Sequence, residues 1–94
     1  EMDDLILSLA IEKWGEDSQI GMAIEECAEC IVALRKLSRV GGRDIDSTKV
    51  HEAVIDEIAD VTIMMRQLAM IFGFASVENR IKYKIERLKV RLEK

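Results

Sequence analysis

The sequence predicts an all-α protein, a compact four-helix bundle with one short and three long helices. Proline is absent from the 94 residues, and four of the five glycines fall at three breaks in the chain. Between these breaks, apolar residues recur every three or four positions, the spacing of an amphipathic helix. A chain of this length forms one domain, 1–94, and a monomer would bury only roughly 60 to 65% of its unfolded surface. We therefore expect a homodimer or homotetramer.

The first predicted helix is short and runs from about Asp3 to Trp14, where Gly15 stops it. Asp17 or Ser18 is the expected cap of a second helix, because short polar side chains satisfy free N–H groups there. The glycines at 41 and 42 are expected to end it. Its apolar stripe consists of Ile20, Ile24, Cys27, Ile31 and Leu34.

A polar loop over 43–46 is expected to lead into the third helix. Asp46 or Ser47 is its expected cap, and Gly73 is the expected stop after Phe72. Ser76 is expected to cap the fourth helix. The apolar side of that last helix carries Val77, Ile81, Ile85, Leu88 and Leu92.

Charge is distributed unevenly along the chain. The net charge is −4, yet residues 76–94 contain seven basic and three acidic residues, so 1–75 carry −8. The acidic total argues against binding a nucleic-acid polymer. An acidic body with a basic last helix suits a site that holds metal ions together with a polyphosphate. No apolar run approaches the ~18 residues of a membrane span and no signal peptide opens the chain, so we expect a cytoplasmic protein without membrane contact.

The third predicted helix carries two acids on the side that should be buried. Glu57 lies in the middle of its apolar line, and Asp60 lies at the edge of that line one turn later. An unpaired carboxylate removed from water costs several kcal/mol, so it needs a partner or must stay wet. No lysine or arginine lies one turn from Glu57 in either direction. The apolar line consists of Val50, Val54, Val61, Met64 and Leu68.

The second predicted helix repeats this arrangement. Glu26 and Glu29 lie one turn apart on a half-apolar flank, whereas Glu25 projects to another side. If the two helices lie side by side, four carboxylates converge and require a cation. Oxygen-only ligands favour Mg²⁺, with Mn²⁺ as a possible substitute. The alternative is that these acids form solvated faces paired with lysine or arginine.

The motif Glu25-Glu26-x-x-Glu29, followed after 27 residues by Glu57-x-x-Asp60, resembles a known signature. It is similar to the EExxE and ExxD motifs of the MazG-like all-alpha nucleoside triphosphate pyrophosphohydrolases. A Trp-Gly pair at 14–15 and a Gln at 19 precede the first motif, as in many family members. The resemblance extends over nearly the whole chain.

The resemblance implies cleavage of a nucleoside triphosphate between its α and β phosphates, which yields a monophosphate and pyrophosphate. It also implies that Glu25 orients a water or a metal ligand. Beside a glycine break, Trp14 could stack on the base, and Gln19 could hydrogen-bond the base or sugar. The alternative is that Trp14 anchors the core or an interface, as a lone tryptophan more often does. The magnesium ligands implied by the resemblance are Glu26, Glu29, Glu57 and Asp60.

The basic last helix supplies the phosphate-binding residues that the resemblance implies. Lys82 and Arg87 match positions that hold the leaving pyrophosphate in family members. The family often has Asn one turn after the lysine, whereas this sequence has Glu86. Asn79, in the preceding turn, is the expected substitute. The alternative is a solvated basic face.

Three other functions compete with this interpretation. A phosphoribosyl-ATP pyrophosphohydrolase would use similar acidic pairs on a different substrate. A carboxylate-bridged di-iron bundle needs Glu-x-x-His pairs, which this sequence lacks. A non-enzymatic helical module would use the acidic and basic faces for oligomerisation or partner binding, and metal would not stabilise it.

Overall fold

The computed structural model describes residues 2–40 and 47–94. In this part of the chain every regular element is an α-helix and none is a strand. One short helix precedes three long ones, so the predicted all-α class is confirmed. The helices are α1 (Asp4–Trp14), α2 (Glu16–Val40), α3 (Ser47–Phe72) and α4 (Phe74–Leu92).

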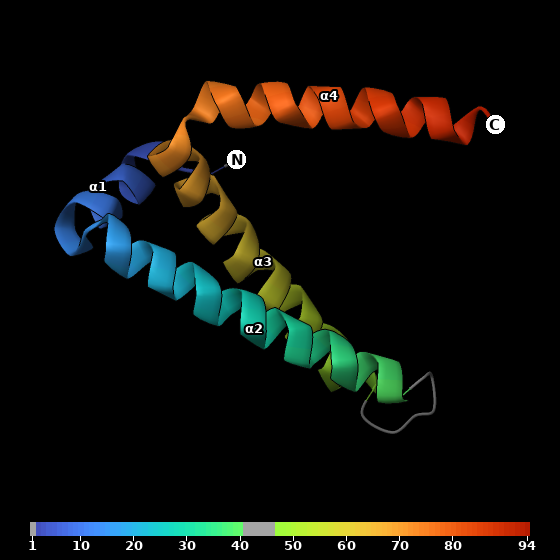
Figure 1. Cartoon of the computed structure of the whole chain (residues 1–94). Helices are drawn as coiled ribbons and strands as arrows, with labels where there is room; N and C mark the ends of the chain where they lie inside the picture. The colour runs from blue at the N-terminus through green and yellow to red at the C-terminus, as the bar shows by residue number, and fades with distance from the viewer. Residues whose placement is uncertain (1, 41–46) are drawn as a thin grey trace.

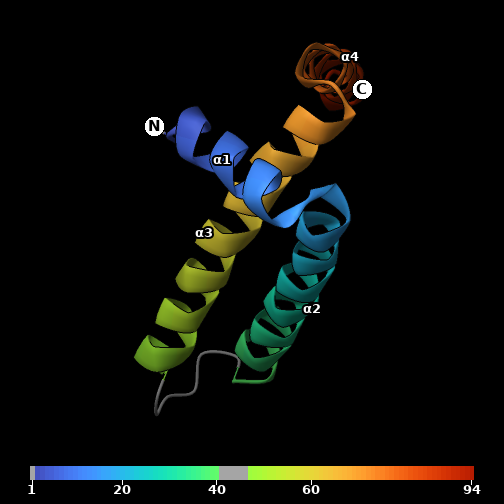
Figure 2. The same ribbon diagram turned by 90° about the vertical axis from the view of Figure 1, so that its left-hand side faces the viewer.

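The centre of the structure is a pair of antiparallel helices, α2 and α3, which lie side by side over most of their length (Figures 1 and 2). The helices approach each other over small side chains, because three of the five buried apolar residues are alanines. These five residues are Ala23, Ala33, Val54, Met64 and Ala69. Side chains of α2 and α3 can therefore meet across the central pair.

α1 packs across the end of this pair, at the start of α2 and the end of α3. Arg66 of α3 fixes its position: Nε and Nη2 donate to the two carboxylate oxygens of Asp4 at 2.9 and 2.8 Å. The hydrogen bond from Arg66 lowers the pKa of Asp4 below its usual value. The same guanidinium lies 4.3 Å from the centre of the Phe74 ring, at the start of α4. Arg66 thus joins three helices.

Two predicted helix starts are wrong, and both errors occur at a glycine. α2 begins at Glu16, directly after Gly15, so neither Asp17 nor Ser18 precedes it as a cap. α4 begins at Phe74 directly after Gly73, which places Ser76 within its first turn. Gly15 and Gly73 have φ of 92° and 111°, a region open to glycine, so one residue suffices to change direction and no capping loop is needed.

The other boundaries agree with the sequence where the structure describes them. Asp3 caps α1, because its Oδ1 accepts from the backbone N–H groups of Leu5 and Ile6. α3 ends at Phe72 as predicted. It starts at Ser47, so Ser47 is a helical residue and not the cap. The expected glycine stop, the polar loop and the cap at Asp46 lie within 41–46, outside the described residues.

α4 diverges from the rest of the chain, so the described helices of a single chain do not form a compact four-helix bundle by themselves. The chain bends by 115° between α3 and α4, and of the described helices α4 contacts only α3 (Figure 1). The radius of gyration is 16.5 Å, against about 12 Å for a compact chain of this length. The sequence cannot reveal this, because the direction taken at Gly73 depends on one pair of dihedral angles.

Within the described residues, no single helix is both long enough and apolar enough to cross a membrane. Residues Thr48–Phe72 and Phe74–Leu92 meet such a criterion of length and composition only when taken together, across the 115° bend.

Candidate metal centre and adjoining cavity

Three carboxylates converge between α2 and α3. One oxygen from each of Glu26, Glu57 and Asp60 lies within 4.8 Å of the other two. Glu57 and Asp60 stand one turn apart on α3, and Glu26 faces them from α2. Magnesium binds oxygen at about 2.1 Å, so its opposite ligands are about 4.2 Å apart. Small side-chain rotations would therefore close this group around one ion.

The electrostatics of this group fit a cation. Glu26 and Glu57 are half-buried, and the Oε1 atom of each is buried without a hydrogen-bond partner in the described structure. Partial removal from water, followed by the charge of Glu29 and then of Asp60, raises the pKa of both carboxyls. Among the described residues, none of these acids forms an ion pair with lysine or arginine. A divalent ion would satisfy both orphaned oxygens.

The two remaining acids of the motifs are placed differently. Glu29 is exposed and lies outside the group of three, but it lines a cavity of about 360 Å³ together with Glu57. Its charge is the largest neighbouring influence on the pKa of both Glu26 and Glu57. Glu25 is exposed on α2 and joins no such group within the part of the chain that the structure describes. The structure thus gathers three of the four predicted ligands and leaves the fourth nearby.

Trp14 and Gln19, which the sequence assigns to the base or sugar, line one cavity of about 500 Å³ between α1, α2 and α3. Gln19 is only 5% exposed, whereas Trp14 is 58% exposed. Gln67 of α3 lines the same cavity and is 2% exposed. Sequence reasoning missed Gln67. The available signal was an amide seven residues after Asp60, which places both on one face of the helix.

Asn79, Lys82 and Arg87 are exposed on α4. Because α4 diverges from α3 and does not contact α2, the structure does not bring these residues to the three acids within one chain (Figure 1). The guanidinium of Arg87 instead lies 5.9 Å from the centre of the Tyr83 ring on its own helix.

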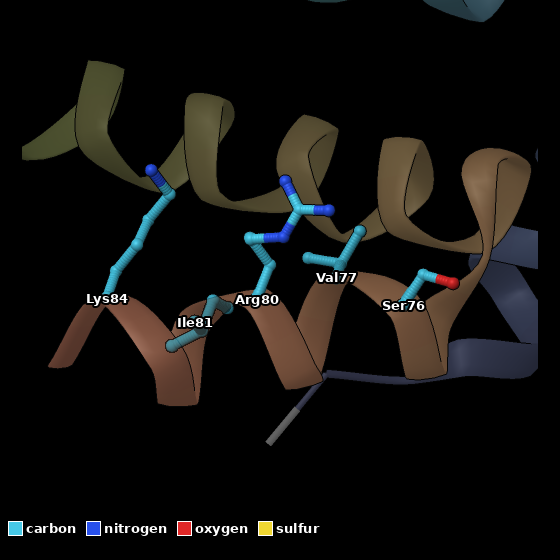
Figure 3. Close-up of a pocket in the computed structure, with 5 residues that line it drawn as sticks. All are labelled: Ser76, Val77, Arg80, Ile81 and Lys84. Carbon is cyan, nitrogen blue, oxygen red and sulfur yellow. The ribbon is translucent and has the colours of Figure 1, made fainter. Parts of the chain in front are cut away.

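A shallow groove of about 380 Å³ lies along α4, on the side that faces α3. Figure 3 shows Arg80 and Lys84 extending from α4 toward the side on which α3 runs. The wall between them is almost entirely apolar and includes Val77 and Ile81. This side of α4 therefore combines an apolar stripe with cationic ends.

No family model, no curated protein and no solved structure matches this chain. The resemblance to MazG-like pyrophosphohydrolases therefore remains a prediction that rests on the two acidic motifs and the residues before them.

Proposed function

We propose that this protein is a cytoplasmic, MazG-like, Mg²⁺-dependent pyrophosphohydrolase. It cleaves nucleoside triphosphates between the α and β phosphates and releases a monophosphate and pyrophosphate. The observation that supports this most strongly is the convergence of Glu26, Glu57 and Asp60, with two buried carboxylate oxygens that lack a hydrogen-bond partner and no ion pair to lysine or arginine among the described residues.

In this proposal Glu26, Glu57 and Asp60 hold the metal, and Glu29 joins them from the next turn of α2. Bound magnesium, or manganese in its place, supplies charge neutralisation for the triphosphate and lowers the pKa of a bound water. Glu25, next to Glu26 in the chain, orients that water or a ligand. The acids themselves repel the triphosphate, so binding depends on the cation they hold.

We also propose that a second copy of this chain covers α4. The solvent-accessible surface is 7373 Å², whereas a compact monomer of 10.7 kDa exposes about 5,500 Å². The excess of about 1,900 Å² per chain corresponds to about 3,700 Å² in a twofold dimer, within the range of obligate homodimers. No residue of α4 is buried.

The uneven distribution of charge also favours a second copy of this chain as the partner of α4. Residues 76–94 carry a net +4 and 1–75 carry −8, so the basic helix of one copy complements the acidic body of the other. Such a dimer would bring Asn79, Lys82 and Arg87 of one copy to the phosphates of a substrate that is bound at the acids of the other copy. Within one chain α4 points away from them.

The test is pyrophosphate release from a panel of canonical and modified nucleoside triphosphates and phosphoribosyl-ATP. Each is incubated with Mg²⁺, with Mn²⁺ or with excess chelator, and the products are resolved by chromatography. We expect monophosphate and pyrophosphate only with metal. Glu57→Gln should abolish the reaction, because it removes a charged ligand. Glu52→Gln, an exposed change five residues earlier on α3, is the matched control and should be fully active.

Each outcome discriminates between functions. If the protein cleaves only phosphoribosyl-ATP, it is a phosphoribosyl-ATP pyrophosphohydrolase of histidine biosynthesis. An active Glu57→Gln protein would refute the assignment of the site. If every substrate stays intact with either metal, the non-enzymatic helical module becomes the better account.

A further inference from the structure

The cavity between α1, α2 and α3 has the shape and lining of a small-molecule site. Its volume is about 500 Å³, and each of the three helices contributes three residues to its wall. Most of that wall is apolar and includes Met22 of α2 and Met64 of α3. Trp14, more than half exposed, adds an aromatic face. Such a mixture of thioether and aromatic surfaces accommodates a flat, polarisable ring.

Two buried primary amides lie in this otherwise apolar wall. The Nε2 atom of Gln67 donates to the backbone carbonyl of Leu7 at 3.3 Å, and this bond fixes the orientation of the amide. The Oε1 atom of Gln67 is then left buried without a hydrogen-bond partner among the described residues. A buried acceptor without a donor destabilises the folded state, so a ligand that donates to it gains binding energy.

Gln19 is the second amide, and it faces the cavity from α2. Its side chain is 5% exposed and makes no hydrogen bond within the described part of the chain. Its amide can turn either way, so it offers a donor or an acceptor to the same ligand. The two glutamines thus provide one fixed acceptor and one adaptable group.

The cavity is aligned with the three acids. Gln19 precedes Glu26 by seven residues on α2, and Gln67 follows Asp60 by seven residues on α3. Seven residues are two helical turns, so each pair shares a face and is separated by about 10 Å along the axis. Because α2 and α3 are antiparallel, both displacements lead to the α1 end (Figure 2). This separation suits a nucleotide whose phosphates lie at the acids and whose base enters the cavity.

We infer that this cavity binds the nucleobase and that Gln67 selects bases with an exocyclic amino group. Gln67 Oε1 accepts a hydrogen bond from that amino group, as an amide oxygen does from adenine or cytosine. A keto oxygen at the same place is itself an acceptor, so no proton would lie between it and Gln67 Oε1. Gln19 pairs with a neighbouring atom of the base edge, and Trp14 covers one face of the ring. The inference rests on the proposed function only for the position of the phosphates.

Trp14 is the only tryptophan, so its fluorescence reports on the cavity directly. We would titrate the full-length protein, in chelator, with cytidine, with uridine and with the pyrimidin-2-one nucleoside, which lacks the 4-amino group. Cytidine should bind about tenfold to a hundredfold more tightly than the other two. Gln67→Met, which keeps the length but removes the acceptor, should abolish this preference. His51→Met, at an exposed position of α3, is the control and should keep it.

The kcat/KM for CTP should likewise exceed that for UTP in the wild type and in His51→Met, and the two values should become similar in Gln67→Met. Equal affinity of wild-type protein for the three nucleosides, or a preference that survives Gln67→Met, would overturn the inference. If circular dichroism shows that Gln67→Met does not fold, the nucleoside without the amino group still decides, because it deletes the same hydrogen bond from the ligand. Hydrolysis of triphosphates without base preference refutes this inference alone. Amino-dependent nucleoside binding without hydrolysis refutes the proposed function alone.

Discussion

Replacing Ile81 and Leu88 with alanine tests whether a second copy of the chain covers the apolar stripe of α4. These side chains are 47% and 45% exposed in the single chain. Full burial of an isoleucine or leucine contributes about 1.5 to 3 kcal/mol, so covering the exposed half contributes about 1 kcal/mol each. A twofold dimer contains each contact twice. The double variant should therefore lose about 4 kcal/mol of dimer stability, about a thousandfold in Kd.

Sedimentation equilibrium across a range of protein concentrations measures this Kd. Val90→Ala is the matched control: Val90 is 55% exposed, and nine residues from Ile81 it lies on the opposite side of α4. The wild type and the control should dimerise, whereas the double variant should be monomeric at the same concentrations with unchanged helical circular dichroism. A wild type that stays monomeric up to about 100 μM, which means a dimerisation free energy weaker than about −5.5 kcal/mol, would refute the area argument. Equal Kd values for the double variant and the control would refute the choice of face.

Three further predictions concern the acids and the core. Glu57→Gln should raise the melting temperature of the chelated protein, measured by circular dichroism, because it removes one charge from a crowded group; an unchanged or lower value would contradict this. The pKa values of Glu26 and Glu57 are raised in the folded protein. The contribution of these two carboxyls to stability is therefore greatest while both are protonated, and it falls as the pH rises through their raised pKa values. Chelated protein should therefore melt at lower temperature at about pH 7.5 than near pH 4.5, the ordinary pKa of a glutamate, and Mg²⁺ should reduce the difference. Met64→Ala should cost about 2 to 5 kcal/mol in urea unfolding, because Met64 is 7% exposed, and clearly more than Met65→Ala, whose side chain is 44% exposed.

The sequence predicted the helices and the paired acids because both depend on local geometry. Apolar residues every three or four positions define one side of a helix whatever surrounds it. The same period places Glu57 beside Asp60 once that segment is helical, so two of the three converging acids could be predicted to be neighbours from spacing alone.

Only the tertiary structure decided which residues meet across helices. The register of α2 against α3 brings Glu26 to Asp60 and Gln19 to the cavity of Gln67, and it depends on contacts between residues far apart in the sequence. The unpaired Oε1 of Gln67 arises because Leu7 of a third helix takes the other end of the amide. The direction of α4 was likewise set at Gly73, where one backbone conformation separates the basic helix from the acids. Helical periodicity is a property of each segment alone, whereas register and direction belong to the packed chain.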